Sequence, residues 1–132
     1  MFEKFLFSQK QVMRYHKAAA RDLSIAQRAK ESEVTFRFAY DALLKTAILI
    51  CAQQGLRVHS RQGHHTELIN KLSEILKDAD IRSIGQEMRE KRNWDLYSGG
   101  IIVSYKEAKE YLEWVERTVR KAEKYIAEAK KR

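Results

Sequence analysis

The chain has no proline and only five glycines among its 132 residues, so little in it interrupts a long helix. It has a single cysteine, Cys51, which excludes a disulfide framework and favours a buried thiol in a reducing compartment. No apolar run approaches the roughly 20 residues that a membrane-spanning helix needs. The opening stretch MFEKFLFSQKQ also lacks the long apolar segment of a secretory signal. We therefore expect a cytoplasmic protein that does not engage a membrane.

The residues that dominate the composition are good helix formers, namely Ala, Leu, Lys, Glu, Arg and Gln. The length is enough for one hydrophobic core and too short for two. The sequence therefore predicts one helical domain that spans residues 1–132.

Positive charge is in excess, with 26 Lys and Arg against 18 Asp and Glu, a formal net charge of +8. Such an excess favours a polyanionic partner, with nucleic acid first. An acidic protein partner, or a purely solubilising role, is the alternative. The excess is uneven along the chain. Residues 1–30 carry seven basic groups against two acids: Lys4, Lys10, Arg14, Lys17, Arg21, Arg28 and Lys30, against Glu3 and Asp22.

The spacing of apolar residues predicts four main helical segments. The first covers about residues 3–31. The second starts near Ser32, a suitable N-cap, and ends before Gly55. Because the second segment is apolar around nearly its whole circumference, it must be covered on several sides, as a central helix or one that also meets a second subunit.

The third segment follows the polar connection GLRVHSRQGHH, bends or is interrupted at KDAD, and ends at YSGG. The fourth opens with an S-x-x-E capping box formed by Ser104 and Glu107. Its apolar residues then alternate steps of four and three, a seam for packing against a neighbouring helix. The pattern predicts an all-α, up-and-down four-helix bundle, with a short fifth helix as a variant.

Familiar catalytic signatures are absent: the sequence has no Gly-rich phosphate loop, no C-x-x-C pair and no G-x-S-x-G. Three histidines cluster in the polar connection, at positions 59, 64 and 65. We predict no metal site there, because two of them are adjacent and only Glu67 could add a carboxylate. A polar connecting loop is the simpler interpretation. Contact with an anion through Arg57, Arg61 and the histidines, His64 among them, is the alternative.

The stretch EMREKRNWDLYSGG, residues 87–100, gathers charge and aromatic side chains at the end of one segment. One interpretation is a solvated basic turn that stops at a glycine cap. The other is a phosphate-binding Arg92, with Asn93, Asp95 and Tyr97 near it and with Arg89 and Lys91 adding charge. Trp94 fits the core of the bundle best, and stacking on a base is the alternative.

Taken in order, AYDALLKTAILICAQQGLRVHSRQGHH, a helix, REKRNWDLYSGG and a capped last helix resemble the HEPN proteins of bacteria and archaea. The likeness covers about residues 18–128. It implies an up-and-down bundle of four or five helices that forms a homodimer. Many HEPN proteins are metal-independent ribonucleases, often toxins paired with a small nucleotidyltransferase antitoxin. Others are non-catalytic and bind nucleotides, RNA or protein partners.

The catalytic signature of that family is an arginine, frequently a polar residue next, and a histidine a few positions further on. Arg92 and Asn93 match the first two places, and Tyr97 stands where the histidine would be. A tyrosine is almost wholly protonated at neutral pH, and losing a general base typically lowers a rate by about 10²–10⁴. We therefore expect phosphate binding to survive better than cleavage, unless Asp95 or a loop histidine acts as the base.

The resemblance thus implies a cleft at which Arg92 of two subunits meet, with the catalytic set Arg92, Asn93, Asp95 and Tyr97. A local ion pair between Arg92 and Asp95 is an equal alternative. Nucleic acid would be held by Arg89, Lys91, Arg92, Arg57, Arg61 and His64, with no cofactor. Two functions remain open. One is a dimer that binds RNA or nucleotide phosphate, with a toxin–antitoxin-type ribonuclease activity that lacks the motif histidine. The other is a non-catalytic module that works with a nucleotidyltransferase.

Overall fold

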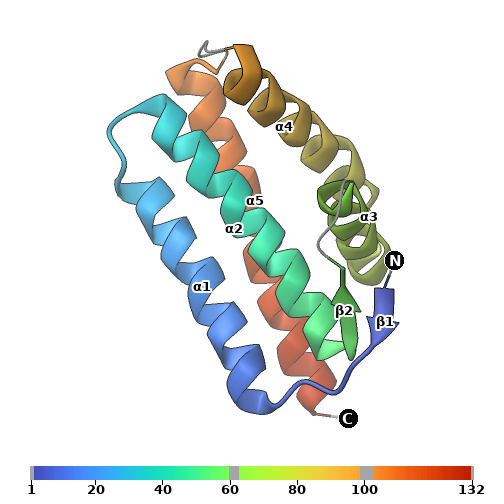
Figure 1. Ribbon diagram of the computed structural model, residues 1–132. Helices are drawn as coiled ribbons and strands as arrows, with labels where there is room; N and C mark the ends of the chain where they lie inside the picture. The colour runs from blue at the N-terminus through green and yellow to red at the C-terminus, as the bar shows by residue number, and fades with distance from the viewer. Residues whose placement is uncertain (1, 60–62, 99–102, 132) are drawn as a thin grey trace.

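The computed structural model describes residues 2–59, 63–98 and 103–131, and for residues 95–98 it describes the backbone alone. Within these residues the chain forms five helices and two short strands (Figure 1). The helices are α1 (Gln9–Arg28), α2 (Ser32–Gln53), α3 (His64–Leu76), α4 (Ala79–Ser98) and α5 (Tyr105–Lys130), and the strands are β1 (Phe2–Lys4) and β2 (Leu56–Val58). The predicted helical fold is confirmed, with the fifth helix that was allowed for.

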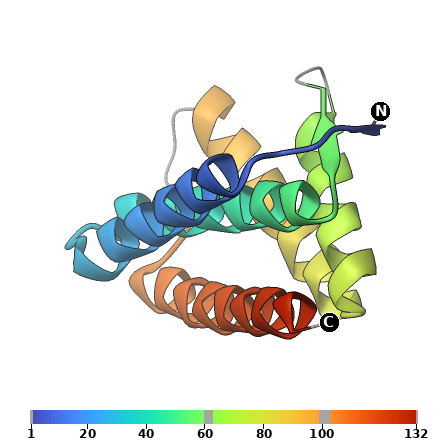
Figure 2. The same cartoon turned by 90° about the horizontal axis from the view of Figure 1, so that it is seen from below.

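Helix α2 lies at the centre and contacts each of the other four helices. In Figure 2, α1 and α5 pack along α2, and α3 and α4 complete the other side. Tyr40, Leu43 and Ile50 are fully buried on it, as is much of the rest of the helix. The cover that the apolar sequence of α2 requires therefore comes from within one subunit. No helix among the described residues is long and apolar enough to cross a membrane.

Of the two alternatives predicted at KDAD, the interruption is confirmed, because α3 ends at Leu76 and α4 begins at Ala79. Lys77 adopts a left-handed conformation with φ 54°, and the hydroxyl of Ser73 donates to the carbonyl of Asp78 at 2.7 Å. The two helices then pack closely, because Gly85 of α4 lies against Ile69 of α3. A Cβ at position 85 would stand 2.6 Å from Cγ2 of Ile69. This close approach fixes the part of α4 that carries its cations against the start of α3.

The two strands were not predicted. β1 pairs antiparallel with β2 in the register Phe2↔Val58, across more than fifty residues of sequence. The prediction that the first helix begins near residue 3 is wrong, because α1 begins at Gln9 with a capping box between Ser8 and Gln11. The predicted N-cap at Ser32 is also wrong. Glu31 occupies that position, and the Ser32 hydroxyl instead donates to the carbonyl of Val103 at 3.4 Å.

Helix α5 begins as predicted, with reciprocal hydrogen bonds between Ser104 and Glu107. Gly55 ends the α2 region with φ +71°, a conformation that favours glycine. Cys51 is buried in α2, and burial raises the pKa of its thiol to about 12. The thiol is therefore protonated and unreactive at neutral pH.

Candidate functional site

The cations near the end of α4 divide between two sides of the helix. Arg89 and Arg92 are three residues apart and lie on one side, facing α2 and the start of α3. Lys91 lies about 100° around the helix from Arg92. It forms an ion pair of 3.4 Å with Glu107 of α5 and lies 5.9 Å from the ring centre of Tyr111. Among the residues that the structure describes, the first side alone combines cations with a histidine.

A tyrosine and a histidine from different helices meet beneath the two arginines. The hydroxyl oxygen of Tyr40, on α2, lies 3.3 Å from Nδ1 of His65, near the start of α3. When Nδ1–H donates to the tyrosine oxygen, Nε2 of the imidazole is free to accept a proton. When the tyrosine hydroxyl donates instead, Nε2 carries the proton. The contact therefore links the protonation of His65 to the buried ring of Tyr40.

Arg92 lies over this pair with an unsatisfied donor. Its guanidinium carbon is 5.9 Å from the centre of the Tyr40 ring. Its Nε is buried and has no hydrogen-bond partner among the described residues. A buried donor without an acceptor costs about 1–3 kcal/mol, and more when the group is charged. An acceptor supplied by a ligand would remove that cost.

Arg89 is held in place by a short chain of amides. Its Nε donates to the side-chain oxygen of Gln86 at 2.8 Å. The amide nitrogen of Gln86 in turn donates to the carbonyl of Thr66 at 3.3 Å and to the side chain of Asn70 at 3.1 Å. These bonds connect α4 to α3. They fix the orientation of Arg89, and the N–H groups on its other two guanidinium nitrogens form no hydrogen bond with the residues that the structure describes.

The pKa values of Tyr40 and His65 are shifted by burial and by the two nearby arginines. Burial, His64, Arg92 and Arg89 all lower the pKa of His65. His65 is therefore neutral at physiological pH and can accept a proton. Burial also raises the pKa of Tyr40, although Arg92 and Arg89 act in the opposite direction. The tyrosine thus stays protonated and acts only through its hydrogen bond.

One carboxylate lies next to these cations. Burial raises the pKa of Asp41, while Arg92, Lys45 and Arg37 act in the opposite direction. Asp41 is therefore surrounded by cations from two helices. Its charge is compensated locally, and the two guanidinium groups give the site a net positive charge.

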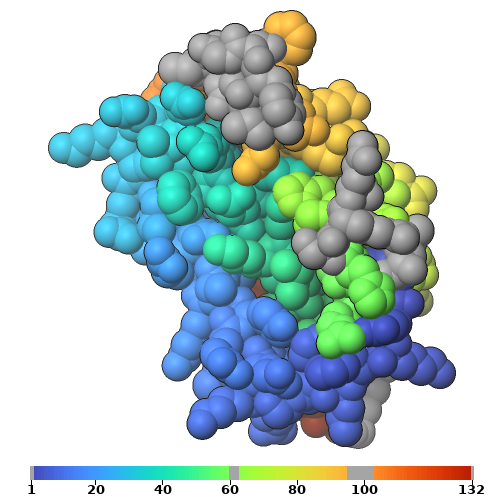
Figure 3. Space-filling model, in the orientation of Figure 1, coloured from blue at the N-terminus to red at the C-terminus, as the bar shows by residue number. Residues whose placement is uncertain are grey.

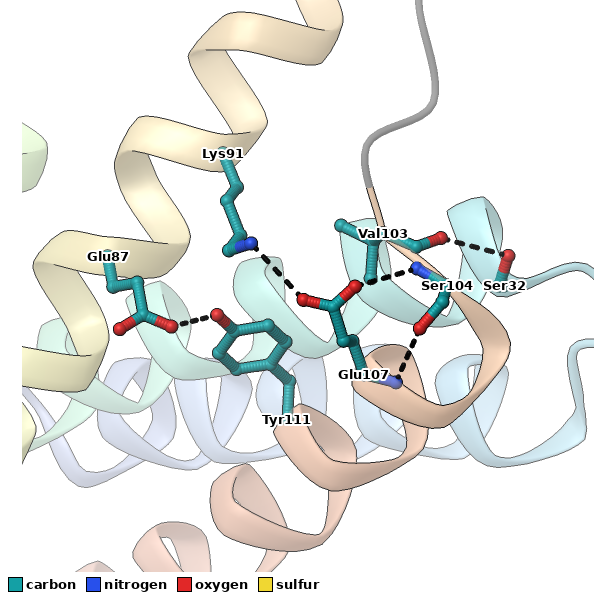
Figure 4. A network of polar contacts seen from close by, with 7 residues as sticks. All are labelled: Ser32, Glu87, Lys91, Val103, Ser104, Glu107 and Tyr111. Carbon is teal, nitrogen blue, oxygen red and sulfur yellow. Dashed lines mark hydrogen bonds and ion pairs between the residues drawn. The ribbon is translucent and has the colours of Figure 1, made fainter.

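The opposite side of α4 is a closed network of paired groups (Figure 4). The hydroxyl of Tyr111 donates to Glu87, and burial together with Glu87 raises the pKa of Tyr111. Glu107 accepts from Lys91 and from the backbone of Ser104, and these bonds lower its pKa. The network ties α4 to α5 and pairs each of its charged groups with a partner inside the fold.

The remaining predicted site residues do not all converge on Arg92. Arg57 lies on β2, where it pairs with Glu3 and stacks on Phe5 with 4.5 Å to the ring centre. The ring of His64 lies 4.4 Å from that of His65, so His64 stands at the edge of the site. Asn93 is half-buried on α4.

Some predictions concern parts of the chain that the structure leaves out. Arg61 lies outside the described residues. Asp95 and Tyr97 lie in the last turn of α4, and their side chains are likewise outside the description. The predicted meeting of these two side chains with Arg92 therefore stays a prediction.

The prediction that Trp94 packs in the core is wrong, because 58% of its surface is exposed. It lies about 200° around α4 from Arg92. The alternative, that the exposed Trp94 ring stacks on a base, stays a prediction. Among the described residues, no group of three or more His, Cys, Asp or Glu side chains is placed to hold a metal ion.

Sequence reasoning missed Tyr40, Asp41 and His65 as partners of Arg92. A signal for Tyr40 was present, since a tyrosine inside an apolar, fully covered helix needs a hydrogen-bond partner for its hydroxyl. His65 was one of the loop histidines for which anion contact or a role as the base was an alternative, but it was not singled out or paired with Tyr40. No local pattern says which histidine reaches Tyr40, because that depends on where α3 begins.

In comparisons with protein-family models, with curated proteins and with solved structures, this chain matches none. The proposed function therefore depends on the sequence and on the geometry of the site.

Proposed function

We propose that the Arg92 site binds the phosphate group of RNA or of a nucleotide. The observation that carries the proposal is the buried Nε of Arg92, which has no acceptor among the described residues and lies beside a second arginine. A phosphate offers several acceptor oxygens and negative charge to a planar guanidinium, and such charge-assisted bonds are about twice as strong as neutral ones. The formal charge of +8 favours a polyanion over a single carboxylate.

We further propose that the protein is of the HEPN type and acts as a homodimer. The order of sequence motifs supports this assignment, as does the helical fold with Arg92 near the end of α4. In such a dimer two copies of Arg92 would face each other. A size measurement in solution tests this part separately from phosphate binding, and a monomer at all concentrations would contradict it.

The test is the affinity for a fluorescently labelled short oligoribonucleotide. We expect Arg92→Gln to weaken binding at least tenfold, about 1.4 kcal/mol, because the substitution removes the charge and keeps the aliphatic stem. Lys124→Gln is the matched control, since Lys124 is an exposed cation on α5. Equal affinities for all three proteins would refute the proposed site. Co-purification with a nucleotidyltransferase, together with no RNA affinity, would favour a partner-binding module instead.

Metal-independent RNA cleavage at the same site is the second candidate. It is favoured by one observation, a neutral His65 beside Arg92 and Arg89. In that reaction Nε2 of His65 would take the proton of a ribose 2′-hydroxyl. The 2′ oxygen would then attack the phosphorus, and the 5′ oxygen would leave and take a proton from water. Arg92 would hold the charge that develops on the phosphate.

The cleavage hypothesis predicts that His65→Gln abolishes 2′,3′-cyclic phosphate ends in the products while RNA binding is retained. The rate should fall as His65 becomes protonated, which happens at a pH below its ordinary pKa of 6.5. RNA that stays intact with the unmodified protein between about pH 6 and 9 would exclude cleavage and leave binding alone.

A further inference from the structure

Helix α1 carries a line of cations on its exposed side. Lys10, Arg14, Lys17 and Arg21 are spaced by four, three and four residues, so they lie within an arc of about 60° along about 17 Å of helix. All four are exposed. We refer to these four residues as the α1 stripe.

The α1 stripe has no local counter-charge. Asp22 is the single acid of α1, and it is buried in an ion pair of 2.5 Å with Lys45 of α2. In the part of the chain that the structure describes, no residue of the stripe forms an ion pair. Helix α5 is different, because its seven cations are nearly balanced by six acids. The positive excess of the protein is thus concentrated on α1.

The stripe lies away from the side of α1 that meets α5. That side is marked by His16, which pairs with Glu123 at 2.7 Å, and by Gln27, which donates to Glu116 at 2.6 Å. The stripe lies roughly 120° around the helix from both. Figure 3 views the molecule from the side on which α1 (blue) and α2 (teal) lie in front of α5.

A bridge of side chains connects the stripe with the Arg92 site. Lys45 stands at the contact between α1 and α2, where it holds Asp22 and keeps 39% of its side chain exposed. Asp41 lies one turn before Lys45 on α2. Burial raises its pKa and the charge of Arg92 lowers it. The charge of Asp22 raises it further, and those of Lys45 and Arg37 lower it. Arg37, Asp41 and Lys45 follow one another at intervals of one turn on α2, so charged groups of both signs continue from α1 across α2 to α4.

From this arrangement we propose that the α1 stripe and the Arg92 site form one track for the backbone of single-stranded RNA. The inference rests on the proposed function of Arg92 and narrows its ligand to a polynucleotide of several residues. Proteins that bind single strands follow the phosphate backbone with a line of cations, over about 4–16 nucleotides. A single strand is flexible enough to pass from α1 across α2 to α4, so it fits this arrangement better than a stiff duplex.

The test compares RNA lengths at several salt concentrations, by fluorescence anisotropy with oligouridylates of about 4 and about 16 nucleotides. We expect the longer RNA to bind the unmodified protein at least tenfold more tightly. The stripe variant K10Q/R14Q/K17Q/R21Q should lose that gain and keep its affinity for the shorter RNA. Each phosphate contact contributes about 0.7 to the slope of log affinity against log salt, so the slope should become shallower by about 3.

The matched control is K109Q/R117Q/R120Q/K124Q, which removes the same charge from exposed positions of α5. It should retain the length-dependent gain. Because all eight side chains are exposed, both variants should unfold at the temperature of the unmodified protein, which circular dichroism checks.

Several outcomes would overturn the inference. A stripe variant that keeps the gain refutes the track and leaves the Arg92 site standing. An equal loss in the α5 control shows that net charge alone matters. A stripe variant that loses affinity for phosphatidylserine vesicles but not for the longer RNA would assign the stripe to a membrane surface. If Arg92→Gln leaves binding of the shorter RNA unchanged, the proposed Arg92 site fails, and the joint track fails with it.

Discussion

The two sides of α4 carry the same types of residue and use them differently. Toward α5, Lys91, Glu87 and Glu107 are paired with each other or with capping and tyrosine groups (Figure 4). Toward α2 and α3, Arg89 and Arg92 exceed the acids, and Arg92 keeps a buried donor without an acceptor among the described residues. The comparison teaches that partners, rather than residue type, separate charges that hold the fold from charges that are available to a ligand.

The largest effect is expected from a substitution that displaces α4 from α3 and so disturbs the side of α4 that carries Arg89 and Arg92. Gly85→Leu places a side chain where even a Cβ would stand 2.6 Å from Ile69, so we expect the free energy of unfolding to fall by about 1–3 kcal/mol or more. Phosphate binding should fall as well, because Arg92 moves away from His65. Urea denaturation and RNA titration measure the two effects. Ser83→Leu, at an exposed position of the same helix, is the control, and equal stabilities of the two variants would contradict the prediction.

A second prediction compares the two sides of α4 by replacing one cation on each, Arg92 and Lys91. Arg92→Gln should weaken RNA binding at least tenfold and change the free energy of unfolding little, since its buried Nε has no partner to lose among the described residues. Lys91→Gln should leave binding within about twofold, because Lys91 is engaged with Glu107 on the other side. Parallel titrations decide the matter. Similar losses for both variants would show that the sides are not distinct.

A third prediction tests whether the side of α4 that faces α5 contributes to stability alone, by removing the capping box of α5. Ser104→Ala should lower the free energy of unfolding by about 1 kcal/mol, because it removes the acceptor for the Glu107 amide. RNA affinity should be unchanged. Ser8→Ala, which removes the equivalent box of α1, should give a similar loss in chemical denaturation. A fall in RNA affinity with Ser104→Ala at a temperature where the protein stays folded would argue against separate sides.

The smallest effect is expected from pH. The pKa of His65 is lowered from 6.5, so as pH falls below about 6.5 the unfolded chain binds the proton first and stability declines. The pKa of Glu107 is lowered from 4.5, so its contribution is present above about 4.5 and is lost as pH falls below it. Thermal melts should therefore show two declines. His65→Gln should remove the upper one. Glu107→Gln should weaken the lower one, to which Glu3 also contributes because its bond with Arg57 lowers its pKa. A single decline unaffected by His65→Gln would contradict this assignment.

Much of the fold could be predicted because its signals are local. The capping box of α5, the glycine after α2 and the apolar circumference of α2 each act within a few residues. The two strands could not be predicted in this way. Each has three residues, and they pair only because the start of the chain returns to the end of α2. The S-x-x-Q signal at Ser8 was available and was overlooked in placing the first helix.

The site residues likewise fall into those that local sequence predicts and those that depend on packing between helices. Arg92 and Arg89 stand out locally, as a cluster of charge at a helix end. Their partners Tyr40 and His65 come from two other helices, and their contact depends on the close packing that Gly85 allows. Trp94 was misplaced because its exposure depends on where α4 turns relative to α5, which spacing alone does not give.

The buried thiol of Cys51 makes this protein convenient for mapping by chemical labelling. It is the one cysteine of the chain, and its raised pKa keeps it silent toward maleimides and spin-label reagents at neutral pH. Met13→Cys or Glu90→Cys, at exposed positions beside Arg14 and Arg89, would therefore supply the sole reactive thiol and keep the proposed binding cations. With a photocrosslinker attached there, the crosslinked positions on an added oligoribonucleotide would show which nucleotides pass close to each label.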